Sequence, residues 1–520
     1  MTARRFRQSR ALRLAVALGC AALAAGCVVG PDFHRPGAPA NAGYAPAPLA
    51  PATEATDIAA GASQRLVSGR DLPFEWWREF GSPALNALVE RSFRHNPTIA
   101  AAQAALTQAQ ELVYAQRGFY YPTVGATYQL ERHKIAGNLT NDQAPGVQGN
   151  GDNLLAPLQD PLHYPHTAPL FYTFHTLELT VGFVPDLLGA NRRQVESLAA
   201  QADVERFALE ATYITLASNV VAAAVQEAEL RAQIEATEEL IAAAARALGI
   251  LQHQLRAGAA SRIDVAAQES ALAQARATLP PLRKQFEQTR DLLRALAGTL
   301  PNEELGERFT LDALRLPEEL PLSLPAQVIE QRPDVRAAEA QLHAANAEVG
   351  VAVAAMLPQF SITGSVGGNA TQIPWLFRSG GSFWNLIGDV TQPLFQGGTL
   401  LHRKRAADAA LRQAAAQYQG TVIAAYQNVA DTLHAALADA QTLHAAHEAE
   451  QAASVTLELT RRQLDAGFVD GLALINAETS LLGARLARIQ AQATRFGDTV
   501  ALYQSLGGGW WHRAESVAER

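Results

Sequence analysis

The sequence is poor in cysteine and in aromatic residues. Only Cys20 and Cys27 occur among its 520 residues, and both lie in the N-terminal apolar stretch. The remaining chain therefore has no thiol for a disulfide framework or a cysteine-ligated zinc site. Aromatic residues make up only 7% of the sequence, whereas alanine is abundant throughout. This composition favours long helices packed side by side over a compact enzyme core.

Positive charge is scarce beyond the N-terminus. The formal net charge is −8, and removing the five positive charges that precede Cys27 leaves −8 − 5 = −13. Such an acidic chain is a poor non-specific ligand for nucleic acid, so this class of partner is excluded. The five basic residues concerned are Arg4, Arg5, Arg7, Arg10 and Arg13.

Long hydrophobic runs are also missing, because no apolar stretch is long enough for a transmembrane helix. The N-terminal apolar run, LAVALGCAALAAG, is too short for a permanent membrane helix and is typical of a signal peptide. It ends Leu23-Ala24-Ala25-Gly26-Cys27, which resembles a bacterial lipobox. We therefore predict a signal peptide over 1–26 and acylation of Cys27; the alternative is an ordinary signal peptide with an incidental cysteine. Any membrane crossing by the mature chain is expected to use strands.

Motifs for catalysis are absent from the sequence. It contains no phosphate loop ending in Gly-Lys-Ser/Thr, no HExxH and no Gly-x-Ser-x-Gly elbow. His444 and His447 are spaced for one helix face but lack a third ligand, and His163 and His166 lie in a polar segment within 131–172. Solvent-exposed histidines are the favoured interpretation. We predict no enzyme, no cofactor and no metal site.

An internal repeat is the main feature that is present. The segment HNPTIAAAQAALTQAQELVYAQRGFYYP, from His95, aligns without a gap to QRPDVRAAEAQLHAANAEVGVAVAAMLP, from Gln331, and both copies carry prolines at the same two places. The difference in residue number between corresponding positions becomes smaller from Pro185 and Pro393 onward, which indicates an insertion in the first copy. Gly258 corresponds to Gly467 at almost the same smaller difference. The mature chain is thus two copies of one unit.

The repeat sets the expected domain boundaries. A Pro- and Ala-rich segment without apolar periodicity precedes the first copy and is predicted to be an extended, lipid-anchored tether. The expected ranges are a signal peptide at 1–26, the tether at 27–70, the first copy at 71–299, a Pro-rich linker at 300–330, the second copy at 331–506 and a C-terminal tail at 507–520.

Each copy is predicted to contain a helix, two strands and a long helical hairpin. Residues 360–366 alternate between apolar and polar, and 177–181 place Leu177, Leu179 and Val181 on one face. The segment between Pro358 and Pro393 is long enough for two strands of bilayer-spanning length and a loop. A soluble two-stranded ribbon is the alternative, but such a ribbon alone is barely stable.

The helices should be very long. Residues 191–257 and 399–466 contain no proline, and each stretch would be about 100 Å long as a helix. Gly258 and Gly467 follow them as expected reversals into antiparallel partner helices. Four strands cannot close a membrane barrel, and open sheet edges are not tolerated in lipid, so the chain is expected to oligomerise.

In its order of elements and motifs the chain resembles the bacterial outer membrane factor family (TolC/OprM-like efflux proteins), and most closely its lipoprotein branch. The resemblance implies an α+β membrane protein, a homotrimer whose 12-stranded outer-membrane β-barrel continues as a periplasmic α-helical coiled-coil barrel. The motifs are Cys27-Val28-Val29-Gly30-Pro31-Asp32-Phe33-His34-Arg35-Pro36, Trp76-Trp77-Arg78-Glu79-Phe80, Asn96-Pro97, Pro185-Asp186-Leu187-Leu188-Gly189, Arg332-Pro333-Asp334-Val335 and Gln392-Pro393-Leu394-Phe395-Gln396-Gly397-Gly398.

The resemblance also implies a function. Such proteins are exit ducts of tripartite efflux pumps, located in the outer membrane and docked to a periplasmic adaptor. The lipoprotein features favour small-molecule efflux with an inner-membrane transporter of the resistance-nodulation-division type. A duct for type I protein secretion is the alternative within this class. A periplasmic coiled-coil structural lipoprotein or adhesin is the alternative from another class, but it leaves the duplicated strand pairs unexplained.

By the same resemblance, the hairpin tips are the adaptor contact and the gate. The predicted contact residues are Gly258, Ala259, Ala260, Ser261, Gly467, Phe468, Val469 and Asp470, and the gate candidates are Arg262, Asp264, Asp470 and Asn476. Some family members carry aspartates six and nine positions past the second glycine, where this chain has Ala473 and Asn476. Asp264 has the alternative interpretation of a helix N-terminal aspartate. We expect Arg262 to pair with Asp470 on a neighbouring tip.

Overall fold

A computed structural model of the chain describes residues 28–37, 39, 43–135, 170–323 and 325–513. The predicted signal peptide, Cys27, His163 and His166 lie outside the described residues. The chain divides into two compact units, and each unit takes residues from both sequence copies. The first unit comprises 1–33, 111–198 and 344–411, and the second comprises 34–110, 199–343 and 412–520. The compact units therefore do not coincide with the two sequence copies.

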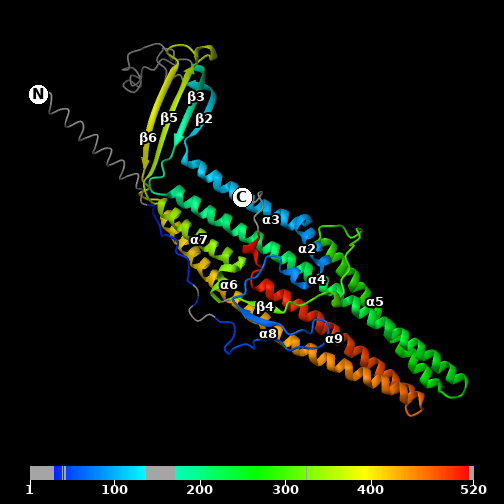
Figure 1. Ribbon diagram of the computed structural model, residues 1–520. Coiled ribbons are helices and arrows are strands. Elements are labelled where there is room, and N and C mark those ends of the chain that lie inside the picture. Colours follow the sequence, from blue (N-terminus) through cyan, green and yellow to red (C-terminus); the bar gives the residue numbers. More distant parts are fainter. Residues whose placement is uncertain (1–27, 38, 40–42, 136–169, 324, 514–520) are drawn as a thin grey trace. The chain divides into compact units, whose positions relative to one another are not determined.

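The first unit contains the four predicted strands. They form one antiparallel sheet in the order β2-β3-β5-β6 (Figure 1), and they span 13, 14, 12 and 10 residues. The shortest of them is already long enough for a tilted strand to cross a bilayer. The bounds are β2 (Thr123–Ile135), β3 (Leu170–Phe183), β5 (Gln359–Ala370) and β6 (Ser382–Thr391).

The helices of the second copy repeat those of the first copy in order and in length. The first helix of each copy begins at a proline, and the two long helices that follow have 67 and 35 residues in both copies. This confirms the predicted order of elements in each copy. The pairs are α3 (Pro97–Arg117) with α7 (Pro333–Ala354), α4 (Ala190–Arg256) with α8 (Thr399–Asp465), and α5 (Arg262–Leu296) with α9 (Gly471–Ser505).

Helix α4 has one window that is long and apolar enough, by length and composition, to cross a membrane. About two thirds of that window, 67%, is buried within the protein. This degree of burial is typical of a helix packed against other helices.

In the second unit, the segments predicted as tether, linker and tail take part in the packed structure. Strand β1 (Arg65–Ser68) lies in the predicted tether and pairs in parallel with β4 (Glu319–Leu322), which lies in the predicted linker. In the predicted tail, the Trp510 indole donates to the Gln331 carbonyl at 2.6 Å. These segments lack helical periodicity but carry enough apolar and hydrogen-bonding groups to pack. The second unit also contains the helices α2 (Pro83–His95) and α6 (Pro325–Gln331). Its 3₁₀ turns are η1 (Trp76–Phe80), η5 (Leu311–Ala313) and η7 (Trp510–His512). The 3₁₀ turns of the first unit are η2 (Gly118–Tyr120) and η6 (Ile373–Trp375).

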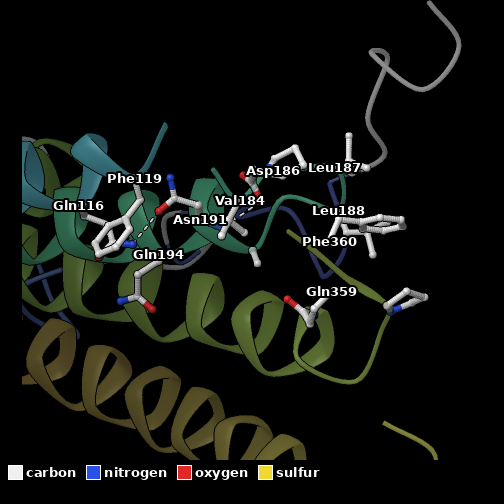
Figure 2. A pocket seen from close by; sticks show the side chains of 13 residues that line it. Gln116, Phe119, Val184, Asp186, Leu187, Leu188, Asn191, Gln194, Gln359 and Phe360 are labelled. Atoms are coloured by element: carbon white, nitrogen blue, oxygen red, sulfur yellow. Dashed lines mark hydrogen bonds between the residues drawn. The ribbon is translucent and has the colours of Figure 1, made fainter. Parts of the chain in front are cut away.

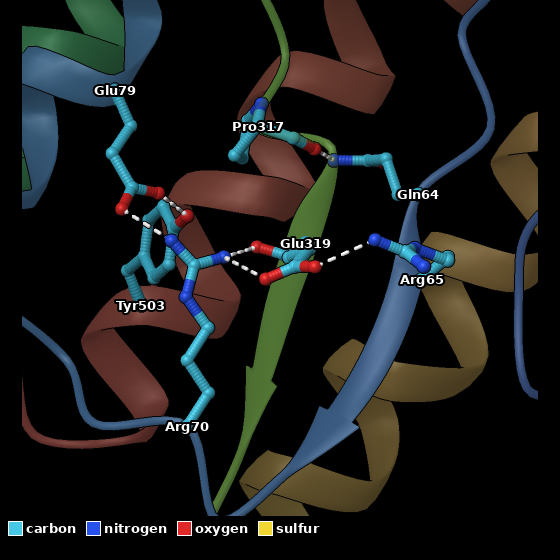
Figure 3. A network of polar contacts seen from close by, with 7 residues as sticks. All are labelled: Gln64, Arg65, Arg70, Glu79, Pro317, Glu319 and Tyr503. Carbon is cyan, nitrogen blue, oxygen red and sulfur yellow. Dashed lines mark hydrogen bonds and ion pairs between the residues drawn. The ribbon is translucent and has the colours of Figure 1, made fainter.

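An aromatic cluster forms part of the second unit's core. Trp76 and Phe80 of η1 are at most 1% exposed and contact Tyr503 and Phe496 of α9. Beside this cluster, Arg70 bridges Glu79 and the β4 residue Glu319 (Figure 3). The Trp-Trp-Arg-Glu-Phe motif therefore serves to join the N-terminal segment to the long helices.

Candidate functional site

The register of the sheet in the first unit separates apolar from polar side chains. In an antiparallel pair, residues directly opposite each other point to the same face. Val124 lies opposite Val181, Leu179 opposite Val366, and Val366 opposite Trp384, so one face carries apolar residues from all four strands. Phe174, Phe383 and Ile387, which are also apolar, lie on the opposite face. The other face carries Thr127, Gln129, Thr176, Glu178, Thr180, Ser361, Thr363, Ser365, Asn385 and Asp389.

This apolar face is open. Val124, Trp384 and Leu386 are 66, 77 and 70% exposed. Strands β2 and β6 stand at the two ends of the strand order, so within the described residues each has one unpaired edge. A sheet with an exposed apolar face and two open edges needs an apolar environment on that face and a partner at each edge.

A cavity of about 440 Å³ lies in the first unit at the foot of the sheet, the end at which β3 leads into α4 and β5 begins (Figure 2). Its lining combines apolar side chains with a few polar ones that are already engaged. The Gln116 amide donates to Asn191 at 2.6 Å, and the Asp186 carboxylate accepts the Asn191 and Arg192 backbone N–H groups at 3.0 and 2.8 Å. Asp186 therefore caps α4, and the cavity has few free groups with which to select a ligand.

Both helical tips close with the same backbone motif in the second unit. Gly258 and Gly467 have φ of +76°, which is the left-handed conformation that glycine adopts most easily. The N–H groups of Gly258 and Ala259 donate to the Leu255 and Gln254 carbonyls at 3.0 and 2.8 Å, and Gly467 and Phe468 repeat the pattern. This is the Schellman closure of a helix C-terminus. The glycines therefore stand where the long helices end, as the sequence predicts.

Two of the four gate candidates at the tips, Asp264 and Asp470, cap the helices that follow the tips. Ser261 and Asp264 form a reciprocal capping box at the start of α5, and hydrogen bonds from Ser261 lower the pKa of Asp264. Asp470 caps α9 by accepting the Ala473 N–H at 3.0 Å. Arg262 is exposed. Within the described chain no ion pair joins Arg262 to Asp470, so that pairing stays a prediction for contacts between tips.

A hollow of about 390 Å³ lies between α4, α8 and α9 in the second unit. Arg485 of α9 pairs with Glu239 of α4 at 2.5 Å, and Arg461 of α8 pairs with Glu478 of α9 at 3.2 Å. The Arg485–Glu239 pair thus links the two helical hairpins, and the Arg461–Glu478 pair joins the two helices of the second hairpin.

Acidic and basic groups of α8 and α9 form a cluster that the sequence does not predict. Asp439 and Asp498 share a hydrogen bond, and burial together with that neighbouring carboxylate raises the pKa of Asp439 to about 7. Arg495 beside them donates to the Ala60 and Ala62 carbonyls at 2.8 Å. The two aspartates belong to different helices and are distant in the sequence, so no local pattern could have paired them.

The histidines of α8 form no metal site in the structure. His444 lies 3.5 Å from Glu448 and 3.8 Å from Glu54, and His447 contacts Gln451. In the described part of the chain no group of three histidine, cysteine or acidic residues is placed to hold a metal ion.

Comparison with known proteins agrees with this geometry. The family model described as outer membrane efflux protein matches residues 88–299 and 324–508, which correspond closely to the two sequence copies. The toluene efflux pump outer membrane protein TtgC of Pseudomonas putida is 27% identical over 492 residues, 94% of each chain. The pyoverdine export outer membrane protein OpmQ of Pseudomonas aeruginosa is 27% identical over 447 residues, 86% of this chain and 90% of that protein.

Solved structures share the fold. The outer-membrane channel OprN superposes with a TM-score of 0.78 at 26% identity, covering 93% of this chain and all of that one. The open-state MtrE channel of Neisseria gonorrhoeae has a TM-score of 0.75 at 23% identity, covering 94% of this chain and all of that one. With the duplicated unit and the amphipathic sheet, these matches confirm the predicted resemblance. The chain belongs to the outer membrane efflux protein family and is an outer-membrane efflux channel, not an enzyme.

Proposed function

We propose that three copies of this chain form one continuous exit duct, anchored in the outer membrane by acylated Cys27. The duct receives small molecules from an inner-membrane transporter of the resistance-nodulation-division type through a periplasmic adaptor. The single observation that supports this most strongly is the four-stranded sheet with one apolar face and two open edges. Three such sheets supply twelve strands, which is within the range that closes as a membrane barrel.

The polar face of the sheet then lines the pore. Thr180, Ser365 and Asn385 lie in one row across three neighbouring strands. Ser365 is buried at 6% exposure, so the groups of this row that meet water and polar solutes are the Thr180 hydroxyl and the Asn385 amide. A duct needs no selective binding site, because the transporter selects the cargo. The names of the relatives, which include toluene and pyoverdine, cover chemically dissimilar cargoes, as expected of such a duct, and favour small-molecule efflux over protein secretion.

The test of the duct is its oligomeric state and conductance. In mild detergent we expect a trimer by light scattering, a monomer only after denaturation, and ion-conducting pores in planar bilayers. A monodisperse monomer that retains its strand content in circular dichroism would overturn the proposal, because the sheet edges would then be stable without partners.

Acylation of Cys27 has its own test. Cys27→Ser should abolish labelling of the protein by a fatty-acid probe and leave the precursor uncleaved by the lipoprotein peptidase. Cys20→Ser is the matched control and should change neither result. A lipid-free wild-type N-terminus, or processing at another residue, would rule out the lipobox interpretation.

The adaptor contact and the gate are proposed at the tips. Because Asp470 caps α9, we choose Asp470→Asn, which removes the charge and keeps the cap. Together with Arg262→Ala it should raise single-channel conductance and leave trimer stability unchanged, since an exposed pair contributes only about 0–1 kcal/mol. Ser261→Ala is the control, because it weakens the α5 cap without removing a charge. Unaltered conductance in the double variant would show that neither residue holds the gate closed.

A further inference from the structure

We propose that Val28–Asp32 is a docking sequence that Arg193 locks against the foot of the sheet, so that the lipid on Cys27 enters the membrane beside the strands. The inference rests on the proposed lipoprotein anchor and concerns the part of the Cys27–Pro36 motif that the channel function leaves unexplained. It also replaces the expected extended tether at this end of the chain with a defined set of contacts.

Arg193 makes the central contacts within the first unit. It lies in the first turn of α4, and its side chain is only 4% exposed. The guanidinium donates to the Asp32 carboxylate at 2.6 Å and to the Val29 and Gly30 carbonyls at 3.2 and 3.4 Å. It also pairs with Glu196 at 2.7 Å. A buried arginine that reaches two backbone carbonyls and a carboxylate holds a segment in one register.

Glycines let the docking sequence approach this closely. Gly30 has φ of +93°, and a Cβ added to it would lie 2.4 Å from the Gly350 Cα of α7. A Cβ on Gly350 would lie 2.8 Å from the Arg193 side chain. The N-terminal backbone, α7 and the arginine are thus stacked in contact, and only glycine fits at the two crossing points.

Two further hydrogen bonds fix the ends of the sequence. The Val29 N–H donates to the Leu188 carbonyl at 3.2 Å, and the Asn346 amide of α7 donates to the Pro31 carbonyl at 2.9 Å. The docking sequence is therefore held by segments of both sequence copies. A flexible tether would need none of these contacts.

The location of the contact gives it a function. Val28 packs on Gly189, in the short connection that follows the end of β3 at Phe183. An acyl chain attached to the preceding residue is thereby delivered to the foot of the strands, where the apolar face of the sheet meets the lipid. Arg193 is in this sense a positioning residue for the anchor.

The proposal is tested with the full-length protein purified as a trimer. Wild type, Arg193→Ala and Asp32→Asn are treated with proteinase K, and mass spectrometry follows release of the lipid-bearing N-terminal peptide. Asp32 is 81% exposed, so Asp32→Asn should fold normally even if Arg193→Ala does not. We expect release to accelerate at least about tenfold in Arg193→Ala, and by a smaller factor in Asp32→Asn. Arg192→Ala, the exposed neighbour, should behave as wild type.

An unlipidated form separates the arginine from the lipid. Cys27→Ala behind a non-lipoprotein signal peptide should still be protected, because protein contacts hold the segment, and should lose protection with Arg193→Ala. Equal release rates in wild type and Asp32→Asn, or loss of protection on removing the lipid alone, would overturn the docking role. Conductance measured on the same preparations reports on the duct separately, so failure of the two proposals can be told apart.

Discussion

Leu386→Lys is expected to prevent assembly of the channel in the membrane, whereas Asn385→Lys is expected to be tolerated. The two residues are neighbours on β6 and point to opposite faces of the sheet. Leu386 lies opposite Gly364 on the apolar face and is 70% exposed, and Asn385 lies opposite Ser365 on the polar face. The same substitution at adjacent positions therefore tests the assignment of the faces and little else.

The size of the effect follows from the cost of a charge in lipid. A lysine on the lipid face of a barrel costs about 2–4 kcal/mol near the membrane midplane, and a trimer carries it three times. The yield of heat-modifiable trimer in the outer-membrane fraction should fall sharply for Leu386→Lys. Asn385→Lys should keep that yield and shift the ion selectivity of the pore toward anions. Equal trimer yields in the two variants would mean that the face assignment is wrong.

The second large effect concerns pH and the Asp439–Asp498 pair. Because the pKa of Asp439 is raised from 3.8 to about 7 in the folded protein, the native state binds a proton that the unfolded state releases. The stability that this proton provides is fully present below about pH 4 and is lost as the pH rises through about 7. The cause is burial of Asp439 first and the neighbouring Asp498 second, with Arg495 acting in the opposite direction.

Asp439→Asn should therefore be more stable than wild type at about pH 8, by about 1–2 kcal/mol once solvent screening of this half-buried group is allowed for. The difference should shrink toward acidic pH. Melting temperatures in detergent across this range are the measurement. Asp431→Asn, an exposed aspartate earlier on α8, is the control and should track wild type. A constant difference between Asp439→Asn and wild type at all pH values would contradict the shared proton.

Local features of the fold were readable from the sequence. The two proline-free stretches became helices of 67 residues each, and Gly258 and Gly467 became the C-terminal closures of those helices. The alternation over 360–366 became one apolar and one polar face of β5. These features depend on residues within a few positions of one another, because backbone conformation, side-chain direction and helix capping are set by near neighbours.

Long-range contacts were decided only by the tertiary structure. The N-terminal segment was expected to be an extended tether, yet β1 pairs with β4, which follows the first copy. Arg193 likewise binds Asp32 near the start of the described chain. Likewise the compact units cut across the two copies that the repeat defines. The sequence alone determined the repeated strand pairs, the long helices and the apolar face of β5, since these follow from local periodicity. Which distant segments meet depends on burial and hydrogen bonding in the packed chain, and no local pattern encodes those pairings.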